Sequence, residues 1–255
     1  MKYFLGYLTA VAVLLGAESS HAAIAHVVST SAGSASGTTV TTSSVNTTGA
    51  NLLVVAVTYY GNTTDPVLSD SKGNTWTGLT AREQSGTTMS VRLYYCVPTS
   101  VGSGHTFTAG PGGTSYPTIS VSAFSGAAAS PYDQETGAAT AGSVTSFQPG
   151  SITPSENNCV LVTGVSTGGT SHGVDSSFNA TATDNVGAQH LGGGIAYKIQ
   201  TTAGAENPTW SWATSSSKAS AMASFKAAAS AARDPLSATI PGVSRDPLTG
   251  TIPGL

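Results

Sequence analysis

The segment Gly164-Val165-Ser166-Thr167-Gly168 has the Gly-x-Ser-x-Gly spacing of a serine hydrolase nucleophile. Such a serine needs a strand-to-helix turn, a histidine that accepts its proton and an acid that orients the histidine. Candidate partners follow in the chain: His172, Asp175, Asp184 and His190. No helical pattern follows Ser166, however, and a chain this rich in glycine and serine produces the motif by chance. The sequence therefore predicts no catalytic residue and no enzyme.

Histidines and acids give only weak metal signals. The histidines His105, His172 and His190 lack the close spacing that places two imidazoles on one zinc ion. Loop carboxylates are hard oxygen ligands that could gather one calcium ion at an end of the fold. These acids are Asp65, Asp70, Asp133, Glu135, Asp175 and Asp184. Because such acids are more often simply solvated, we predict no cofactor and no metal ligand, and leave calcium as an open alternative.

Aromatic side chains are the best candidates for binding chemistry. Their flat faces stack on the C–H edges of pyranose rings, and nearby amides hydrogen-bond to sugar hydroxyls. Tyr59 and Tyr60 are adjacent in a strand-like run, so they point to opposite faces, and we expect Tyr60 to point outward beside Asn62. Together with Trp76 and Tyr132, Tyr60 and Asn62 are the predicted ligand contacts.

Short strands must position these residues. About a dozen segments rich in β-branched residues are separated by turns that contain glycine, proline or asparagine, and no long 3.6-residue period appears beyond the N-terminus. Trp210 and Trp212 are two residues apart, so both are expected to face the core. The pattern predicts an all-β fold, a jelly-roll-like antiparallel β-sandwich over residues 23–229.

An internal repeat refines this fold. The matched positions are Leu93 with Ala196, Phe107 with Trp210, Phe124 with Phe225, and Asn51 with Asn158. The two pseudo-repeats cover about 37–130 and 142–229, as expected if one unit was duplicated. We expect the two duplicated halves to share one sandwich, because sharing a core avoids exposed edges, with two tandem domains as the alternative.

The turn from Asp70 to Trp76 carries a resemblance. Its sequence, Asp70-Ser71-Lys72-Gly73-Asn74-Thr75-Trp76, resembles an Asp-Ser-x-Gly-Asn-Thr-Trp turn in uncharacterised bacterial and phage-associated extracellular β-sandwich domains. Such domains often sit in large surface or carbohydrate-related proteins, and the resemblance covers about residues 37–229. It implies no catalytic residue. The turn also has a structural reading, with Gly73 and Asn74 in a tight turn, Asp70 accepting backbone donors and Trp76 closing the end of the sandwich.

Composition and the N-terminus predict export. Residues 1–22 have the basic start, apolar stretch and small-residue cleavage site of a signal peptide, and the apolar stretch is short for a transmembrane anchor. Only 8% of residues are charged and the net charge is -3, so the chain lacks a basic surface for nucleic acid. We expect a secreted or cell-surface protein that does not span the membrane after signal removal.

Two cysteines, Cys96 and Cys159, lie in the two halves. In an oxidising compartment they could form one disulfide, which would add roughly 4 kcal/mol by the loop-entropy model. The alternative is two separately buried thiols, and one pair of cysteines offers no spacing pattern that decides between them.

The C-terminal tail, residues 230–255, contains a different repeat. Residues 233–242 return twelve positions later as 245–254, each with the pattern Arg-Asp-Pro-Leu-x-x-Thr-Ile-Pro-Gly. Proline and scarce apolar surface favour an extended tail without its own core. We expect the tail to dock as a strand on another copy of the chain. The apolar residues predicted to make this contact are Leu236, Ile240, Leu248 and Ile252.

Two functions fit these features. The first is a non-catalytic surface module that binds an extracellular glycan or mediates adhesion. The alternative is a structural subunit of an extracellular filament or matrix, assembled through the tail.

Overall fold

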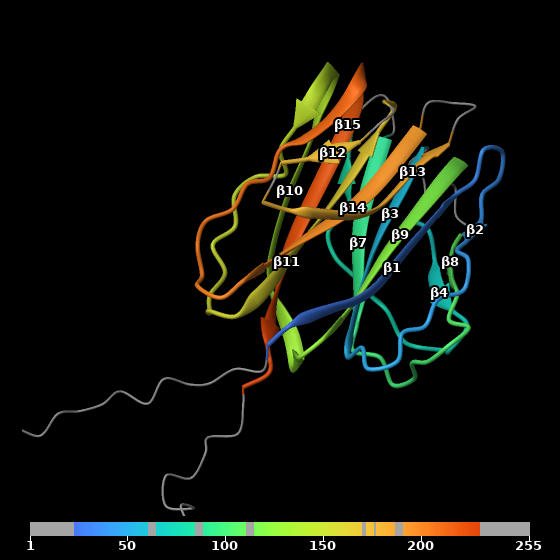
Figure 1. Cartoon of the computed structure of the whole chain (residues 1–255). Helices are drawn as coiled ribbons and strands as arrows, with labels where there is room; N and C mark the ends of the chain where they lie inside the picture. The colour runs from blue at the N-terminus through green and yellow to red at the C-terminus, as the bar shows by residue number, and fades with distance from the viewer. Residues whose placement is uncertain are drawn as a thin grey trace, which may run out of the picture. The chain divides into compact units, whose positions relative to one another are not determined.

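Strands are the regular structure of this protein in the part of the chain that the computed structural model describes, and no helix occurs there (Figure 1). The structure describes residues 23–60, 65–84, 89–110, 115–169, 172–175, 177–186 and 191–229. The described residues therefore contain no helix of the length and apolarity needed to cross a membrane. The predicted signal at 1–22 and the tail at 230–255 lie outside the described residues, as do Asn62 and His190.

The first half of the chain builds a six-stranded antiparallel sheet. Its strands run in the order β1 (Ala25–Gly33), β9 (Ser115–Ser125), β3 (Leu52–Tyr60), β7 (Met89–Cys96) and β5 (Thr77–Gly78), and β6 (Arg82–Glu83) also pairs with β7. The central strand β3 is buried on both faces, which explains its continuous apolar sequence.

The second half builds another six-stranded antiparallel sheet. Its order is β10 (Ala127–Phe147), β15 (Trp210–Ala227), β11 (Cys159–Thr167), β14 (Leu191–Gln200) and β13 (Asn179–Val186), and β12 (Gly173–Val174) pairs with β15. A third, three-stranded sheet contains β2 (Val40–Thr41), β8 (Phe107–Ala109) and β4 (Leu68–Asp70) in the order β2-β8-β4.

The two large sheets pack face to face as a β-sandwich. Alternate residues of β3, such as Leu52 and Val54, share one buried cluster with Val160 and Val162 of β11. The intervening residues of β3 belong to a separate cluster with Phe107 of the small sheet. Both halves therefore contribute to one inter-sheet core, and the alternation of side chains along each strand separates this core from the outer clusters.

The two cysteines do not form the disulfide considered from the sequence. Cys96 is a buried free thiol in the cluster between the first sheet and the small sheet. Cys159 is a buried free thiol in a third cluster, with Trp210 and Met222, on the outer face of the second sheet. Because the thiols point away from each other on opposite sides of the sandwich, the disulfide is wrong for this structure and the alternative of two separate thiols holds.

The two large sheets share one strand order. In each, the five strands of the main path lie in the chain order first, last, second, fourth and third. The register agrees as well. In the first sheet Leu52 pairs with Phe124 and Val54 with Tyr95, and in the second sheet Val160 pairs with Phe225 and Val162 with Tyr197. The duplication stays a prediction, which this shared order favours, and the jelly-roll connectivity stays a prediction as well.

The register corrects two of the matches made from sequence. Phe124 and Phe225 both face the inter-sheet core, as their match requires. Leu93 also faces that core, but Ala196 faces the outer cluster, and the inward residue beside it is Ile195. A slip of one residue reverses every side chain of a strand. Leu93 therefore corresponds to Ile195. By the same register, Asn51 corresponds to the residue that follows Asn158, and not to Asn158 itself.

Candidate functional site

Of the four residues predicted to contact a ligand, Asn62 lies outside the described residues, and the other three do not form one site. Tyr60 is 42% exposed at the end of β3, while Tyr59 is buried, as the adjacency of the two tyrosines predicted. Tyr132 is on β10, and its neighbour across the sandwich is Tyr95. Val54 pairs with Tyr95 and lies six residues from Tyr60 along β3, which corresponds to roughly 20 Å. Tyr60 and Tyr132 are therefore separate surface positions.

Trp76 belongs to a structural turn. Its indole Nε1 donates to Asp70 Oδ2 at 2.8 Å, and the Lys72 backbone N–H donates to Asp70 Oδ1 at 2.8 Å. Gly73 takes a φ of 74°, which glycine adopts without strain, whereas Asn74 does not have a positive φ. The Asp70 side chain is fully buried, so the turn holds its carboxylate away from solvent and from any calcium ion.

Behind this turn lies a buried histidine. His105 Nδ1 bonds to Thr47 Oγ1 at 2.8 Å, and His105 Nε2 lies 3.1 Å from Asp70 Oδ1 without the alignment of a hydrogen bond. Burial lowers the pKa of His105, against a smaller opposing effect of Asp70. The Thr47, His105 and Asp70 side chains have the chemistry of a catalytic triad, but all three are buried and they serve the packing of the small sheet.

The Gly-x-Ser-x-Gly segment is part of a strand. Ser166 is 2% exposed within β11, and its hydroxyl lies 3.9 Å from the Met89 sulfur. A Cβ atom at Gly164 would meet the Ala56 Cβ at 2.9 Å, so this glycine allows the two sheets to approach closely. The motif therefore has a packing explanation. Within the described residues, no three histidine, cysteine or acidic side chains are grouped to hold a metal ion.

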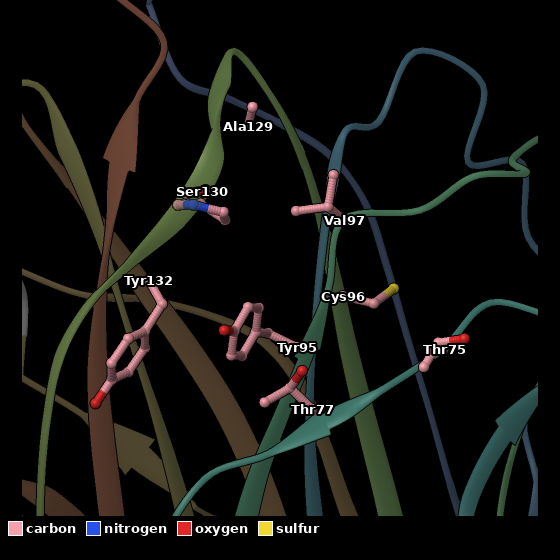
Figure 2. A pocket seen from close by; sticks show the side chains of 9 residues that line it. Thr75, Thr77, Tyr95, Cys96, Val97, Ala129, Ser130 and Tyr132 are labelled. Carbon is pink, nitrogen blue, oxygen red and sulfur yellow. The ribbon is translucent and has the colours of Figure 1, made fainter.

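A pocket of about 460 Å³ opens where the two sheets meet, beside Tyr132 (Figure 2). The first sheet contributes Tyr95, Cys96 and Thr77, and the adjoining loops contribute Thr75 and Val97. The second sheet contributes residues 129–132 of β10. The nine lining residues, all of them described, include no acid, base or histidine.

Tyr95 and Tyr132 form the aromatic wall of this pocket, and we call them the tyrosine pair. Their ring centroids are 5.8 Å apart and their planes differ by 13°, and Phe225 lies 5.4 Å behind Tyr95. Tyr132 is 36% exposed, and Figure 2 shows the Tyr95 ring turned toward Tyr132. Burial raises the pKa of the Tyr132 hydroxyl, with a further contribution from Glu135, so this hydroxyl keeps its proton.

Several pocket hydroxyls are free to bind a ligand. Within the described residues, no side-chain hydrogen bond is formed by the hydroxyls of Thr75, Thr77, Tyr95, Ser130 or Tyr132. Burial raises the pKa of the Cys96 thiol to about 12, so the thiol is protonated and not a nucleophile, and Figure 2 shows its sulfur turned away from Tyr132. The pocket thus combines flat apolar faces with neutral donors and acceptors.

An irregularity in β10 produces this pocket. Ala127 pairs with Ala227 and Tyr132 pairs with Phe225, so five steps along β10 are matched by two steps along β15. Residues 128–131, which we call the β10 excursion, stand opposite the single residue Lys226, a surplus of three residues, and they include Pro131, which lacks a backbone donor. A bulge of this kind interrupts the backbone hydrogen-bond ladder between two strands and redirects the side chains of the bulged strand.

The sequence pointed to Tyr132 and missed the rest of the pocket. Tyr94 and Tyr95 are adjacent, as Tyr59 and Tyr60 are, so the same alternation could have identified one of them as facing away from the outer cluster. Tyr94 is the buried member, and its hydroxyl donates to the Pro66 carbonyl at 2.8 Å. The predicted tail contacts Leu236, Ile240, Leu248 and Ile252 lie outside the described residues.

Comparisons of the chain with protein-family models, curated proteins and solved structures found no match. The interpretation of the pocket therefore comes from its geometry, and the resemblance carried by the Asp70–Trp76 turn stays an expectation.

Proposed function

We propose that this protein is an exported, non-catalytic module that binds carbohydrate in the pocket of the tyrosine pair. The observation that carries the proposal is the stacked pair of tyrosines in an uncharged, hydroxyl-lined pocket between the two sheets. Sugar rings present apolar C–H faces and a rim of hydroxyls, and both have partners in this lining.

The chemistry of the lining favours binding over catalysis. Glycoside cleavage needs a pair of carboxyl groups on either side of the bond, and the lining residues provide none. A nucleophilic mechanism needs an activated group, whereas the Cys96 thiol is protonated at physiological pH. A module that holds a glycan without changing it is consistent with these groups.

The position of the pocket suggests how binding would be detected. Its walls come from β5 and β7 of one sheet and from β10 of the other, so a bound sugar would bridge the two sheets. A ligand that binds the folded state alone also raises the melting temperature. We therefore expect binding to be visible both in a titration and as a rise in thermal stability.

The test is a glycan array probed with the protein, followed by titration of each bound glycan. We expect Tyr132→Ala and Tyr95→Ala to weaken binding about ten-fold or more, as for truncation of a central aromatic contact. Tyr60→Ala is the matched control, since it removes a similarly exposed tyrosine from a distant position. Binding by no glycan, or loss of binding in Tyr60→Ala alone, would reject the proposal.

A further inference from the structure

Acidic groups stand close to the pocket although none lines it. Glu135 follows Tyr132 by three residues on β10, and its carboxylate reaches across to the first sheet. Glu135 accepts hydrogen bonds from the Thr80 backbone N–H at 3.0 Å and from Thr80 Oγ1 at 2.6 Å. These bonds fix the carboxylate at the seam, the line along which β10 meets the strands β5 and β6.

Asp133 is a second fixed acid beside Tyr132. Its carboxylate accepts hydrogen bonds from Ser155 Oγ at 2.5 Å, from the Ser155 backbone N–H at 3.0 Å and from Ser224 Oγ at 2.9 Å. Burial would raise the pKa of Asp133, but these hydrogen bonds together lower it, so the group is ionised at neutral pH. Two negative charges therefore follow Tyr132 on its own strand, with the Asp133 carboxylate beside Ser224 on the outer face of the second sheet and the Glu135 carboxylate at the seam.

One basic group lies near enough to oppose them. After burial, Glu135 is the largest influence on the Tyr132 hydroxyl, and Asp133 acts in the same direction. Arg82 acts in the opposite direction and is the smallest of the influences. The charged groups that act on Tyr132 thus leave its hydroxyl in a negative electrostatic environment.

We infer that the pocket selects glycans by charge, binding uncharged sugar rings and excluding those that carry carboxylate or sulfate groups. This inference rests on the proposed function and specifies its ligand class. An anionic substituent in the pocket would lie near fixed carboxylates without a basic partner in the lining, and partial desolvation strengthens this repulsion.

The experiment compares matched glycans that differ only in charge, such as galacturonate oligomers and their methyl esters, within an array that also contains neutral and sulfated chains. We expect every strongly bound glycan to be uncharged, with acidic counterparts at least about ten-fold weaker at low salt. High salt should reduce this difference, because it screens the repulsion.

The variant Glu135→Gln keeps an acceptor for Thr80 and removes one charge. It should narrow the difference between neutral and acidic glycans, whereas Glu83→Gln, which removes a charge elsewhere on the first sheet, should leave the difference unchanged. Equal or tighter binding of acidic glycans, or an unchanged difference in Glu135→Gln, would overturn the inference while leaving carbohydrate binding in place. Binding of no glycan at all would instead reject the proposed function and this inference together.

Discussion

Two aromatic groups occupy corresponding positions on the two sheets: one lines the pocket, and the other adjoins a chain of polar contacts among the described side chains. In the first group Tyr95 reaches across to Tyr132 and Phe225 of the second sheet. In the second group Tyr197 reaches across to His26 and Phe124 of the first sheet. The stacked rings differ by 13° in both groups, with centroids 5.8 Å apart in the first and 4.9 Å apart in the second.

The difference between the groups follows from the edge strands. In β1, Ala25 pairs with Ser125 and His26 with Phe124, without a break between them. The corresponding stretch of β10 contains the β10 excursion. Beside His26, a chain of polar contacts continues through Ser29, Ser122 and Thr181, with distances of 2.7, 3.0 and 3.0 Å. The first aromatic group thus has a surplus of three residues in its edge strand, whereas the second has no surplus between Ala25 and His26.

The strongest test of the comparison is to truncate the phenylalanine at the centre of each group. Phe124 and Phe225 are fully buried in the inter-sheet core. Phe124→Ala and Phe225→Ala should each lower the free energy of unfolding by about 3–5 kcal/mol, because each leaves a cavity. Urea denaturation measures both losses. A large loss in one variant and almost none in the other would contradict the correspondence of the two groups.

Deleting the surplus residues of β10 should make the aromatic group of Tyr95 resemble that of Tyr197. Deletion of residues 129–131 would let β10 continue in register from Ala127 to Tyr132, as β1 does from Ala25 to His26. We expect the pocket to close and glycan binding to weaken about 30-fold or more, with the fold retained. Calorimetric titration and circular dichroism would follow the two properties. Pro131→Ala keeps the length of the excursion and should keep binding, and strong binding by the deletion variant would show that the excursion does not form the site.

A smaller effect is expected from a single pocket hydroxyl. Thr77→Val keeps the shape of the side chain and removes a hydroxyl that has no partner among the described residues. If this hydroxyl bonds to the ligand, binding should weaken by about 0.5–1.5 kcal/mol, with thermal stability in the absence of ligand unchanged. Thr41→Val, on the small sheet, is the control for binding. Unchanged affinity in Thr77→Val would remove Thr77 from the contact set.

The smallest effect concerns pH and the second group. Burial lowers the pKa of His26 below its ordinary value of 6.5, so the unfolded chain binds the proton more readily than the folded protein does. Neutral His26 makes its full contribution to the free energy of unfolding above pH 6.5, and this contribution is lost as the pH falls below 6.5. His26→Tyr should therefore reduce the loss of stability between pH 7 and pH 5, measured by urea denaturation at each pH. Tyr132→Phe should keep the wild-type slope, and an unchanged slope in His26→Tyr would exclude His26 as a contributor.

The sequence predicted the class of fold and some orientations well. Alternation predicted that one of Tyr59 and Tyr60 points outward, which is Tyr60, and it placed Trp210 and Trp212 in the core, where both are buried. The pairing register of the strands was harder to predict from the sequence, because residues 52–57 are apolar at every position and buried on both faces. A pattern without alternation does not distinguish a correct pairing from one shifted by a single residue.

Most of the pocket could not be predicted from the sequence. Tyr132 was predicted as a contact, but its partner Tyr95 is 37 positions away in the chain and belongs to the other sheet. The β10 excursion has no sequence signal of its own apart from Pro131, because alanine and serine occur throughout this chain. Trp76 was predicted as a ligand contact because it is aromatic, whereas its indole donates a hydrogen bond to Asp70 and stabilises the turn.

The bridging position of the pocket has a mechanical consequence. A polymer anchored between β10 and the pair β5 and β7 would pull on strands from both layers, so tension would not peel one layer away on its own. The load would instead act across the whole inter-sheet core, whose many apolar contacts would have to slide together before the protein yields. Under flow, such an attachment should release its polymer before it unravels.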